Sequence, residues 1–389
     1  MIARPLAVLL ASAVLLSACA SDEAPEVAHL DDVTVIENTG PGSWADAEEP
    51  LMSFDLQQTF GSDDGSEAML ATVQDVTTDA NGNVYVLDVR SHRLLSFAPD
   101  GTLRWAVRRE GEAPGEFAGT FWRSPLAYDG ATGVWVINQN GSRLDHFHTA
   151  DGALVEAHNL APLDIRFASL AGITSAGHFI VATGMPGHVG EQIHRLNLEE
   201  GRVIDAREVY LRAEPLDSDT RAELPEFSVQ NDRLLGRYAL NHYELWEATL
   251  TGDPVRVITR EGKKMLRSGQ YAMDGGGIRF QVYSTLAGPF LLPDDHLLTY
   301  TFYATGVQDP DAHLRRMIEQ DGPPPTFNTT IDLFAPDGSF LGSRVWEGQQ
   351  EPPIGTPVHV SAEGQLYTRT NEPFPQVRRF ALTINAPAP

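Results

Sequence analysis

The chain has 389 residues, enough for two average domains or one large all-β domain, and its 42% hydrophobic and 21% charged residues are typical of a packed globular protein. Its 28 lysines and arginines face 53 acidic residues, so the formal net charge is −25. A surface this acidic repels phosphate backbones, and we expect no nucleic-acid partner. The only lysines are Lys263 and Lys264, which leaves lysine Schiff-base chemistry and Walker-type phosphate loops almost without a candidate residue.

The N-terminus has the pattern of a targeting segment. Arg4 precedes an apolar run over residues 6–16 that is too short to span a bilayer comfortably, and the run ends at Leu16-Ser17-Ala18-Cys19. This ending resembles the lipobox of bacterial lipoproteins. The resemblance implies that residues 1–18 are a signal peptide, and that Cys19 becomes the N-terminus and carries a diacylglyceryl group. The alternative is an ordinary secretory signal with a chance cysteine.

Cys19 is the only cysteine, so we expect no disulfide. Two or three acyl chains at this residue would give a stable membrane anchor. Ala20 follows the cysteine where an aspartate would stand in the pattern for the inner membrane. This resembles the sorting pattern of outer-membrane lipoproteins, facing the periplasm or the cell surface.

Residues 19–50 contain acidic side chains but no lysine or arginine, so we interpret most of this segment as a flexible, self-repelling tether. Within it, Val33-Thr34-Val35-Ile36 could form a short edge strand.

From Leu51 onward the pattern is β throughout. The sequence Phe97-Ala98-Pro99-Asp100-Gly101 recurs as Phe334-Ala335-Pro336-Asp337-Gly338, each time between apolar alternating runs. Proline, aspartate and glycine in this order form a tight turn, so each copy predicts a hairpin. The first copy belongs to four successive antiparallel strands over residues 73–78, 84–87, 93–97 and 102–107. A unit that returns along the chain indicates a repeat protein.

The hairpin between the first two strands of this unit occurs six times in all, whereas the hairpin between the last two occurs five times. The last unit therefore lacks an outer strand, and residues 51–60 form a strand that belongs to no preceding unit. A ring of blades closes when such an N-terminal strand completes the last blade. We predict an all-β, six-bladed β-propeller of four-stranded antiparallel blades over residues 51–389. Residues 309–320 should form a short helix between the second and third strands of blade five.

The first blade carries a family resemblance. Residues 79–88, 93–97 and 111–117 are similar to an NHL repeat, and the chain also resembles the six-bladed, TolB-like propellers of bacterial lipoproteins. This resemblance implies a fold and not an activity, because relatives include binding scaffolds, lactonase-like hydrolases and an amidating lyase.

Loops between the second and third strands of a blade, and loops between blades, share one face of a propeller, where the channel opens. We expect ligand-binding residues on this rim or at the entry of the inner strands. Arg123 and Arg166 occupy similar positions in blades two and three, and two guanidinium groups near the channel of so acidic a protein suggest a carboxylate or phosphate ligand. The alternative is that each pairs with an acidic side chain. The candidates are Arg123, Arg166, His188, His194, His242 and Arg369.

The sequence predicts no catalytic residue, no metal site and no cofactor. No histidine spacing indicates zinc, and there is no nucleophile elbow and no His-Glu-x-x-His motif. Calcium in the channel would need acids and amides from several inner strands, for which Asp75, Asn138 and Glu226 are conceivable ligands.

The sequence thus predicts a monomeric, lipid-anchored scaffold in the periplasm or at the outer membrane. It would present its channel face to a protein, a peptide or a small anionic ligand. The alternative is a metal-dependent hydrolase or lyase, with calcium or zinc at the central channel.

Overall fold

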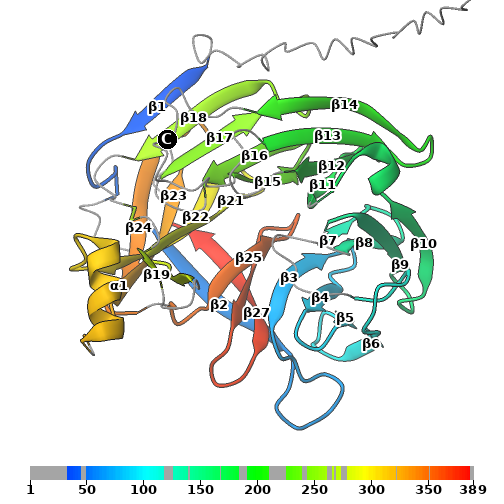
Figure 1. Cartoon of the computed structure of the whole chain (residues 1–389), viewed down its shortest axis with the longest axis horizontal. Coiled ribbons are helices and arrows are strands. Elements are labelled where there is room, and N and C mark those ends of the chain that lie inside the picture. Colours follow the sequence, from blue (N-terminus) through cyan, green and yellow to red (C-terminus); the bar gives the residue numbers. More distant parts are fainter. Residues whose placement is uncertain are drawn as a thin grey trace, which may run out of the picture.

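Six sheets are arranged in a ring, as the predicted β-propeller requires (Figure 1), and together they line a central cavity. The structure is a computed structural model that describes residues 33–44, 50–117, 126–138, 141–166, 168–183, 191–209, 225–238, 243–260, 265–266, 269–272, 278–320, 322–349 and 351–385. In each of the six blades the strand at one edge of the sheet lines the cavity, and the other strands follow outward. The predicted fold class is confirmed.

The first three blades follow one another with simple hairpin connectivity. Blade one contains β3 (Val73–Thr78), β4 (Val84–Asp88), β5 (Arg93–Phe97) and β6 (Leu103–Arg108). Blade two contains β7 (Leu126–Tyr128), β8 (Gly133–Asn138), β9 (Arg143–His148) and β10 (Leu154–Asn159). After the short 3-10 helix η2 (Ala161–Leu163), blade three contains β11 (Ala168–Ile173), β12 (Phe179–Thr183), β13 (Glu191–Asn197) and β14 (Arg202–Val209).

The last three blades have the same hairpin connectivity, and blade six has only three strands after residue 350. Blade four contains β15 (Pro225–Gln230), β16 (Arg233–Tyr238), β17 (Glu244–Ala248) and β18 (Pro254–Arg260). Blade five contains β21 (Ser284–Leu291), β22 (Leu297–Thr305), β23 (Thr326–Phe334) and β24 (Phe340–Trp346). Blade six contains β25 (Thr356–Val360), β26 (Gln365–Thr370) and β27 (Gln376–Ile384).

The ring closes through the N-terminal strand, as the sequence predicts. Strand β2 (Met52–Phe60) pairs antiparallel with β27 and becomes the fourth strand of blade six. Both ends of β2 are anchored, because Met52 and Phe60 are buried. The closure covers the edge of β27, which would otherwise be open for pairing with another chain.

The edge strand expected near residue 33 also forms. It is β1 (Thr34–Asn38), which adds to blade four by parallel pairing with β18. The Asn38 amide donates to the Gly338 carbonyl (3.0 Å) and its oxygen accepts from the Phe340 N–H (2.7 Å), so β1 also bridges to blade five. The parallel pairing was not expected from the sequence.

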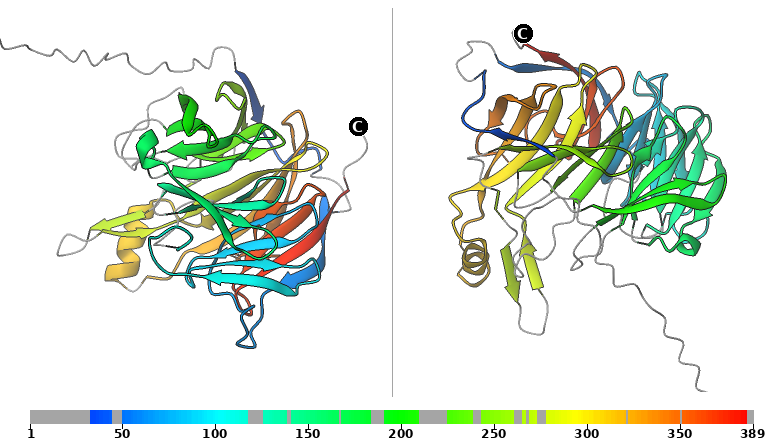
Figure 2. Two further views of the ribbon diagram at one scale, coloured as in Figure 1. Left: turned by 90° about the vertical axis from the view of Figure 1, so that its right-hand side faces the viewer. Right: turned by 90° about the horizontal axis from the view of Figure 1, so that it is seen from above.

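Two insertions project from the same side of the ring (Figure 2). Helix α1 (Pro310–Glu319) joins β22 to β23, where the sequence predicts a helix, and the side chain of Asp309 accepts a hydrogen bond from the Ala312 N–H (3.0 Å). The hairpin β19 (Gly269–Ala272) and β20 (Ile278–Gln281) lies in the connection between blades four and five. Both connections belong to the face where the inner strands begin.

The repeated turn has the expected chemistry. The Asp100 carboxylate accepts from the Thr102 N–H (2.9 Å), and the Asp337 carboxylate accepts from the Ser339 N–H (2.8 Å). Gly101 and Gly338 have φ values of 88° and 87°, in the left-handed region that favours glycine. Both turns join the two outer strands of a blade, away from the channel.

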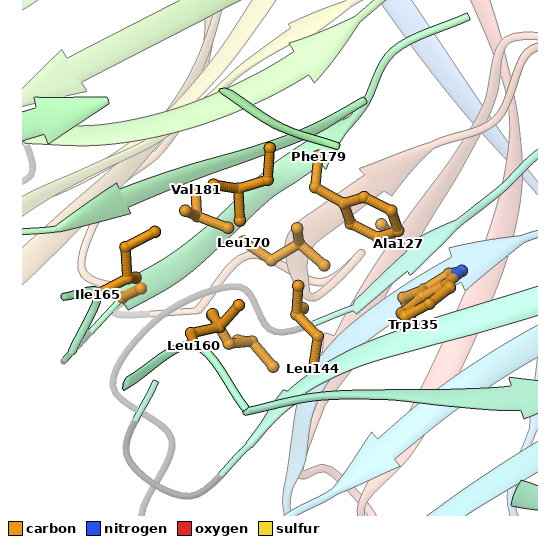
Figure 3. Packing of buried hydrophobic residues seen from close by; sticks show 11 residues of the cluster. Ala127, Trp135, Leu144, Leu160, Ile165, Leu170, Phe179 and Val181 are labelled. Carbon is orange, nitrogen blue, oxygen red and sulfur yellow. The ribbon is translucent and has the colours of Figure 1, made fainter. Parts of the chain in front are cut away.

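Apolar side chains fill the spaces between neighbouring blades. Figure 3 shows the cluster between blades two and three, where Trp135 packs edge-on against Phe179 with ring centroids 4.6 Å apart. Leu144 and Leu170 extend this cluster from the two facing sheets. Such packing fixes each blade against the next, and therefore fixes the positions of the strands that line the channel.

Candidate functional site

All six blades line one cavity of about 880 Å³ at the centre of the ring. Its walls are the inner strands β3, β7, β11, β15, β21 and β25, together with residues from β16, β22 and β26. Pockets that bind small molecules have volumes of roughly 300–1,000 Å³. The cavity is therefore large enough for a ligand.

The charged residues of this cavity all lie at one end. Each comes from the start of a first strand, the end of a second strand, or the loop before a first strand, and these parts of the blades meet at one face. This is also the face of α1 and the β19–β20 hairpin. We call this end the charged mouth; its residues are Asp75, Glu226, Arg237, Glu351 and Arg369.

Two arginines occupy equivalent positions in blades four and six. Arg237 and Arg369 are each the fifth of six residues in the second strand of their blade. Arg237 is 8% exposed and forms an ion pair with Glu226, which is opposite it in the sheet register. The Arg369 Nη1 donates to the carbonyls of Val73 (2.8 Å) and Gln74 (3.2 Å), and so ties blade six to blade one.

Asp75 ties blade one to blade two. Its carboxylate accepts from the Val76 N–H (2.9 Å) and from the Leu126 N–H (3.0 Å). Burial raises the pKa of Asp75 to about 7, although both hydrogen bonds and the positive charge of Arg369 act in the opposite direction. The group therefore changes charge near neutral pH.

Tyr300 lines the cavity from β22. Burial raises the pKa of its hydroxyl to about 12, the hydrogen bond with Thr356 and the charge of Arg369 lower it, and the charge of Glu351 raises it further. The Glu351 Oε1 is buried and has no hydrogen-bond partner among the described residues.

The opposite end of the cavity is polar without being charged. The His359 Nε2 lies 3.0 Å from the Thr78 Oγ1, and burial lowers the pKa of this imidazole to about 4. His359 is consequently neutral near pH 7. The cavity therefore has a charged mouth and a neutral far end.

Two solved Bacteroides structures have a similar fold. A member of the DUF4221 family from Bacteroides vulgatus matches with a TM-score of 0.51 and 10% identity, over 86% of this chain and 99% of that chain. A Bacteroides fragilis protein, named as a candidate exported protein, matches with a TM-score of 0.54 and 8% identity, over 91% of this chain and 100% of that chain. At such identities the likeness shows the fold alone.

Sequence comparison adds no family. No protein-family model matches the chain, and no curated protein matches it in sequence. Within the described part of the chain, no helix has the length and apolarity that crossing a bilayer requires.

The structure places three of the predicted ligand-binding residues. Arg369 lies at the charged mouth. Arg166 is exposed in the connection before β11 and does not line the cavity. The expected position of His194 on a rim loop is wrong, because His194 is a buried residue of β13. Its Nε2 lies 3.1 Å from the Thr183 Oγ1 of the neighbouring strand β12, and His194 does not line the cavity.

The other predicted residues lie outside the described residues. They are Cys19, Arg123, His188 and His242.

The three conceivable calcium ligands are not brought together. Asp75 and Glu226 line the cavity. Asn138 is buried elsewhere and donates to the Glu116 carbonyl (2.5 Å) and to the Asp145 carboxylate (3.0 Å). Across the described ranges, no group of three or more histidine, cysteine, aspartate or glutamate side chains could hold a metal ion.

Arg237 and Glu351 were not among the sequence candidates. The repeat itself contains a signal for Arg237, because Leu234 and Leu366 are equivalent after the first hairpin of their blades, and an arginine follows three residues later in both. Glu351 carries no such signal, since it lies in a connection between blades where the copies differ.

Proposed function

We propose that this protein is a ligand-binding β-propeller of the cell envelope, which uses its charged mouth to hold a small ligand through an anionic group. The observation that carries this proposal is the cavity of about 880 Å³ with arginines at equivalent positions of blades four and six. A cavity with a few placed polar groups is the usual form of a small-molecule site.

Arg369 is the residue best suited to receive the anionic group. The hydrogen bonds that it makes with the described residues all use Nη1, so the two backbone carbonyls orient the guanidinium and leave Nε and Nη2 as donors for a ligand. A guanidinium presents a planar fork of donors that matches a carboxylate. Arg237 is already paired with Glu226 and adds positive charge nearby.

The envelope location is supported by the N-terminal sequence. Leu16-Ser17-Ala18-Cys19 has the pattern of a lipoprotein cleavage site, and the structural neighbour from Bacteroides fragilis is named as a candidate exported protein. We propose that acyl chains on Cys19 hold the propeller at the outer membrane. Replacing Cys19 by alanine should release the protein from the membrane fraction, and mass spectrometry of the wild-type N-terminus should show the acyl groups.

The ligand proposal is tested with N-acetyl-alanyl-alanine, which carries a carboxylate and no positive charge. Calorimetric titration of the full chain in detergent should show binding to the wild type, at least about tenfold weaker binding to Arg369→Gln, and intermediate binding to Arg369→Lys, which keeps the charge and loses the fork. Arg166→Gln is the matched control, because Arg166 is exposed and away from the cavity. Equal effects of the Arg166 and Arg369 variants would contradict the proposal.

A further inference from the structure

We infer that the ligand of the charged mouth is dipolar, an amino acid or short peptide whose carboxylate lies at Arg369 and whose ammonium group lies at Glu351. This inference rests on the proposed function and adds the chemical class of the ligand. Four observations about the cavity support it.

The first observation is the unsatisfied carboxylate of Glu351. This residue lines the cavity from the connection between β24 and β25, and its Oε1 is buried without a hydrogen-bond partner among the described residues. A buried carboxylate oxygen without a donor is unfavourable, so such atoms normally have a partner. An ammonium group brings three donors and a positive charge, and would supply that partner.

The second observation is that Arg369 and Glu351 belong to the same blade and the same end of it. Arg369 lies opposite Thr356 in the register of β25 and β26, and Glu351 stands in the connection that leads into β25, before Thr356. The positive and the negative group therefore both belong to blade six at the mouth. A single small molecule with opposite charges at its two ends can contact both.

The third observation is the balance of charge. Arg237 and Glu226 neutralise each other in blade four, so the remaining ionisable groups of the mouth are one arginine, Arg369, and two carboxyl groups, those of Glu351 and Asp75. The whole chain has a formal net charge of −25. A purely anionic ligand would be repelled on approach, whereas a ligand with no net charge would not.

The fourth observation is the space beyond the two charges. The cavity has a volume of about 880 Å³, and its lining includes, beside polar groups, the apolar side chains of Phe302, Pro357 and Val358. It lies in the upper part of the roughly 300–1,000 Å³ range of small-molecule sites. This favours a short peptide, whose side chains would pack along these walls, over a single amino acid.

Four related probes test the inference by calorimetric titration of the full chain in detergent. Alanyl-alanine carries both charges, N-acetyl-alanyl-alanine carries the negative charge alone, alanyl-alanine amide carries the positive charge alone, and free alanine is the amino acid. We expect alanyl-alanine to bind at least about tenfold more tightly than either singly charged form, and more tightly than alanine.

Glu351→Gln should remove the preference for the free ammonium group, so that alanyl-alanine and its acetylated form bind equally. Glu347→Gln is the matched control, because Glu347 is exposed in the segment before β25 and does not line the cavity. Alanyl-alanine and its amide should likewise bind equally to Arg369→Gln.

Two results would overturn the inference in distinguishable ways. If the acetylated dipeptide binds the wild type as tightly as alanyl-alanine, the site recognises only the carboxylate of the ligand. The proposed function then stands without the inference. If neither peptide with a free carboxylate binds, the proposed function fails together with the inference. Tighter binding of alanine than of alanyl-alanine would keep the dipolar class and overturn the preference for a peptide.

Discussion

At the scale of single residues, buried polar groups hold the blades to one another. Tyr243 donates a hydrogen bond to the Asp332 carboxylate (2.6 Å) across the junction of blades four and five. The same carboxylate accepts from Arg260 (2.9 Å) and Ser343 (2.5 Å). Burial and the neighbouring Asp332 keep the pKa of Tyr243 well above its usual value, so the hydroxyl remains a donor.

Tyr243→Phe should therefore lower the free energy of unfolding by about 1–3 kcal/mol, because a buried carboxylate loses a donor. Tyr128→Phe is the comparison, since the Tyr128 hydroxyl donates to the Ala131 carbonyl (2.8 Å) at an exposed position. That change should cost no more than about 0.5 kcal/mol. Urea unfolding of both variants measures the difference, and equal losses would show that the buried network does not hold the junction.

Asp75 should make stability depend on pH. Its carboxyl group has a pKa of about 7 in the folded chain against 3.8 for the ordinary group, so the folded state holds a proton that the unfolded state has released between these values. The contribution of Asp75 is complete below about pH 4 and is lost as the pH rises through about 7, with a slope of at most about 1.4 kcal/mol per pH unit.

Urea unfolding between about pH 4 and pH 7 tests this dependence. In Asp75→Asn the free energy of unfolding should fall less steeply with rising pH, by up to about 1.4 kcal/mol per pH unit, which corresponds to one proton. This difference in slope does not depend on the absolute stability of the variant. Parallel pH profiles of the variant and the wild type would mean that Asp75 is ionised throughout this range.

At the scale of elements, the repeated turn has a packing role that its sequence does not reveal. A Cβ added to Gly338 would lie 2.7 Å from the Ile36 Cδ1 of β1 and 3.0 Å from the Ile258 Cδ1 of β18. Gly177 also has a left-handed φ, of 76°, but nothing lies within 4 Å of its added Cβ.

Gly177→Ala should cost about 1–2 kcal/mol from the backbone conformation alone. Gly338→Ala should cost clearly more, because it also displaces β1 from blade five. Thermal unfolding of the two variants separates the backbone contribution from the packing contribution. Equal melting temperatures would show that β1 contributes no stability at this contact.

The closing strand should matter more than β1. A chain without residues 1–44 loses β1, whereas a chain without residues 1–60 also loses β2 and exposes the edge of β27. Burial of the Met52 and Phe60 side chains alone contributes about 3–6 kcal/mol. The second deletion should lower the melting temperature by at least about 5 °C relative to the first. Closely similar melting temperatures would contradict closure through β2.

At the scale of the whole molecule, the fold was predictable because its signals are local. Turn residues, alternation of apolar side chains and a count of hairpins sufficed to predict six blades and the closing strand. The sequence did not predict which strand β1 pairs with, since Thr34 pairs with Arg256, far along the chain. A short alternating run indicates a strand but does not indicate its neighbour.

The candidate site was only partly predictable for the same physical reason. Its residues come from different blades, as when Arg369 bonds the carbonyl of Val73 or Asp75 bonds the N–H of Leu126. No spacing between residues in the sequence indicates such contacts between blades. Arg369 was found because it lies near the end of a second strand, on the correct face, whereas His194 was misplaced because it belongs to β13, a strand that was not predicted from the sequence. Glu351 became visible only through the cavity that it lines.

The most direct test is a crystal structure of the full chain with alanyl-alanine. Our account predicts the dipeptide in the central cavity, with its carboxylate within hydrogen-bond distance of the Arg369 guanidinium and its ammonium group within hydrogen-bond distance of the Glu351 carboxylate. An empty cavity in crystals grown with a large excess of the dipeptide, or a dipeptide bound elsewhere on the ring, would contradict it.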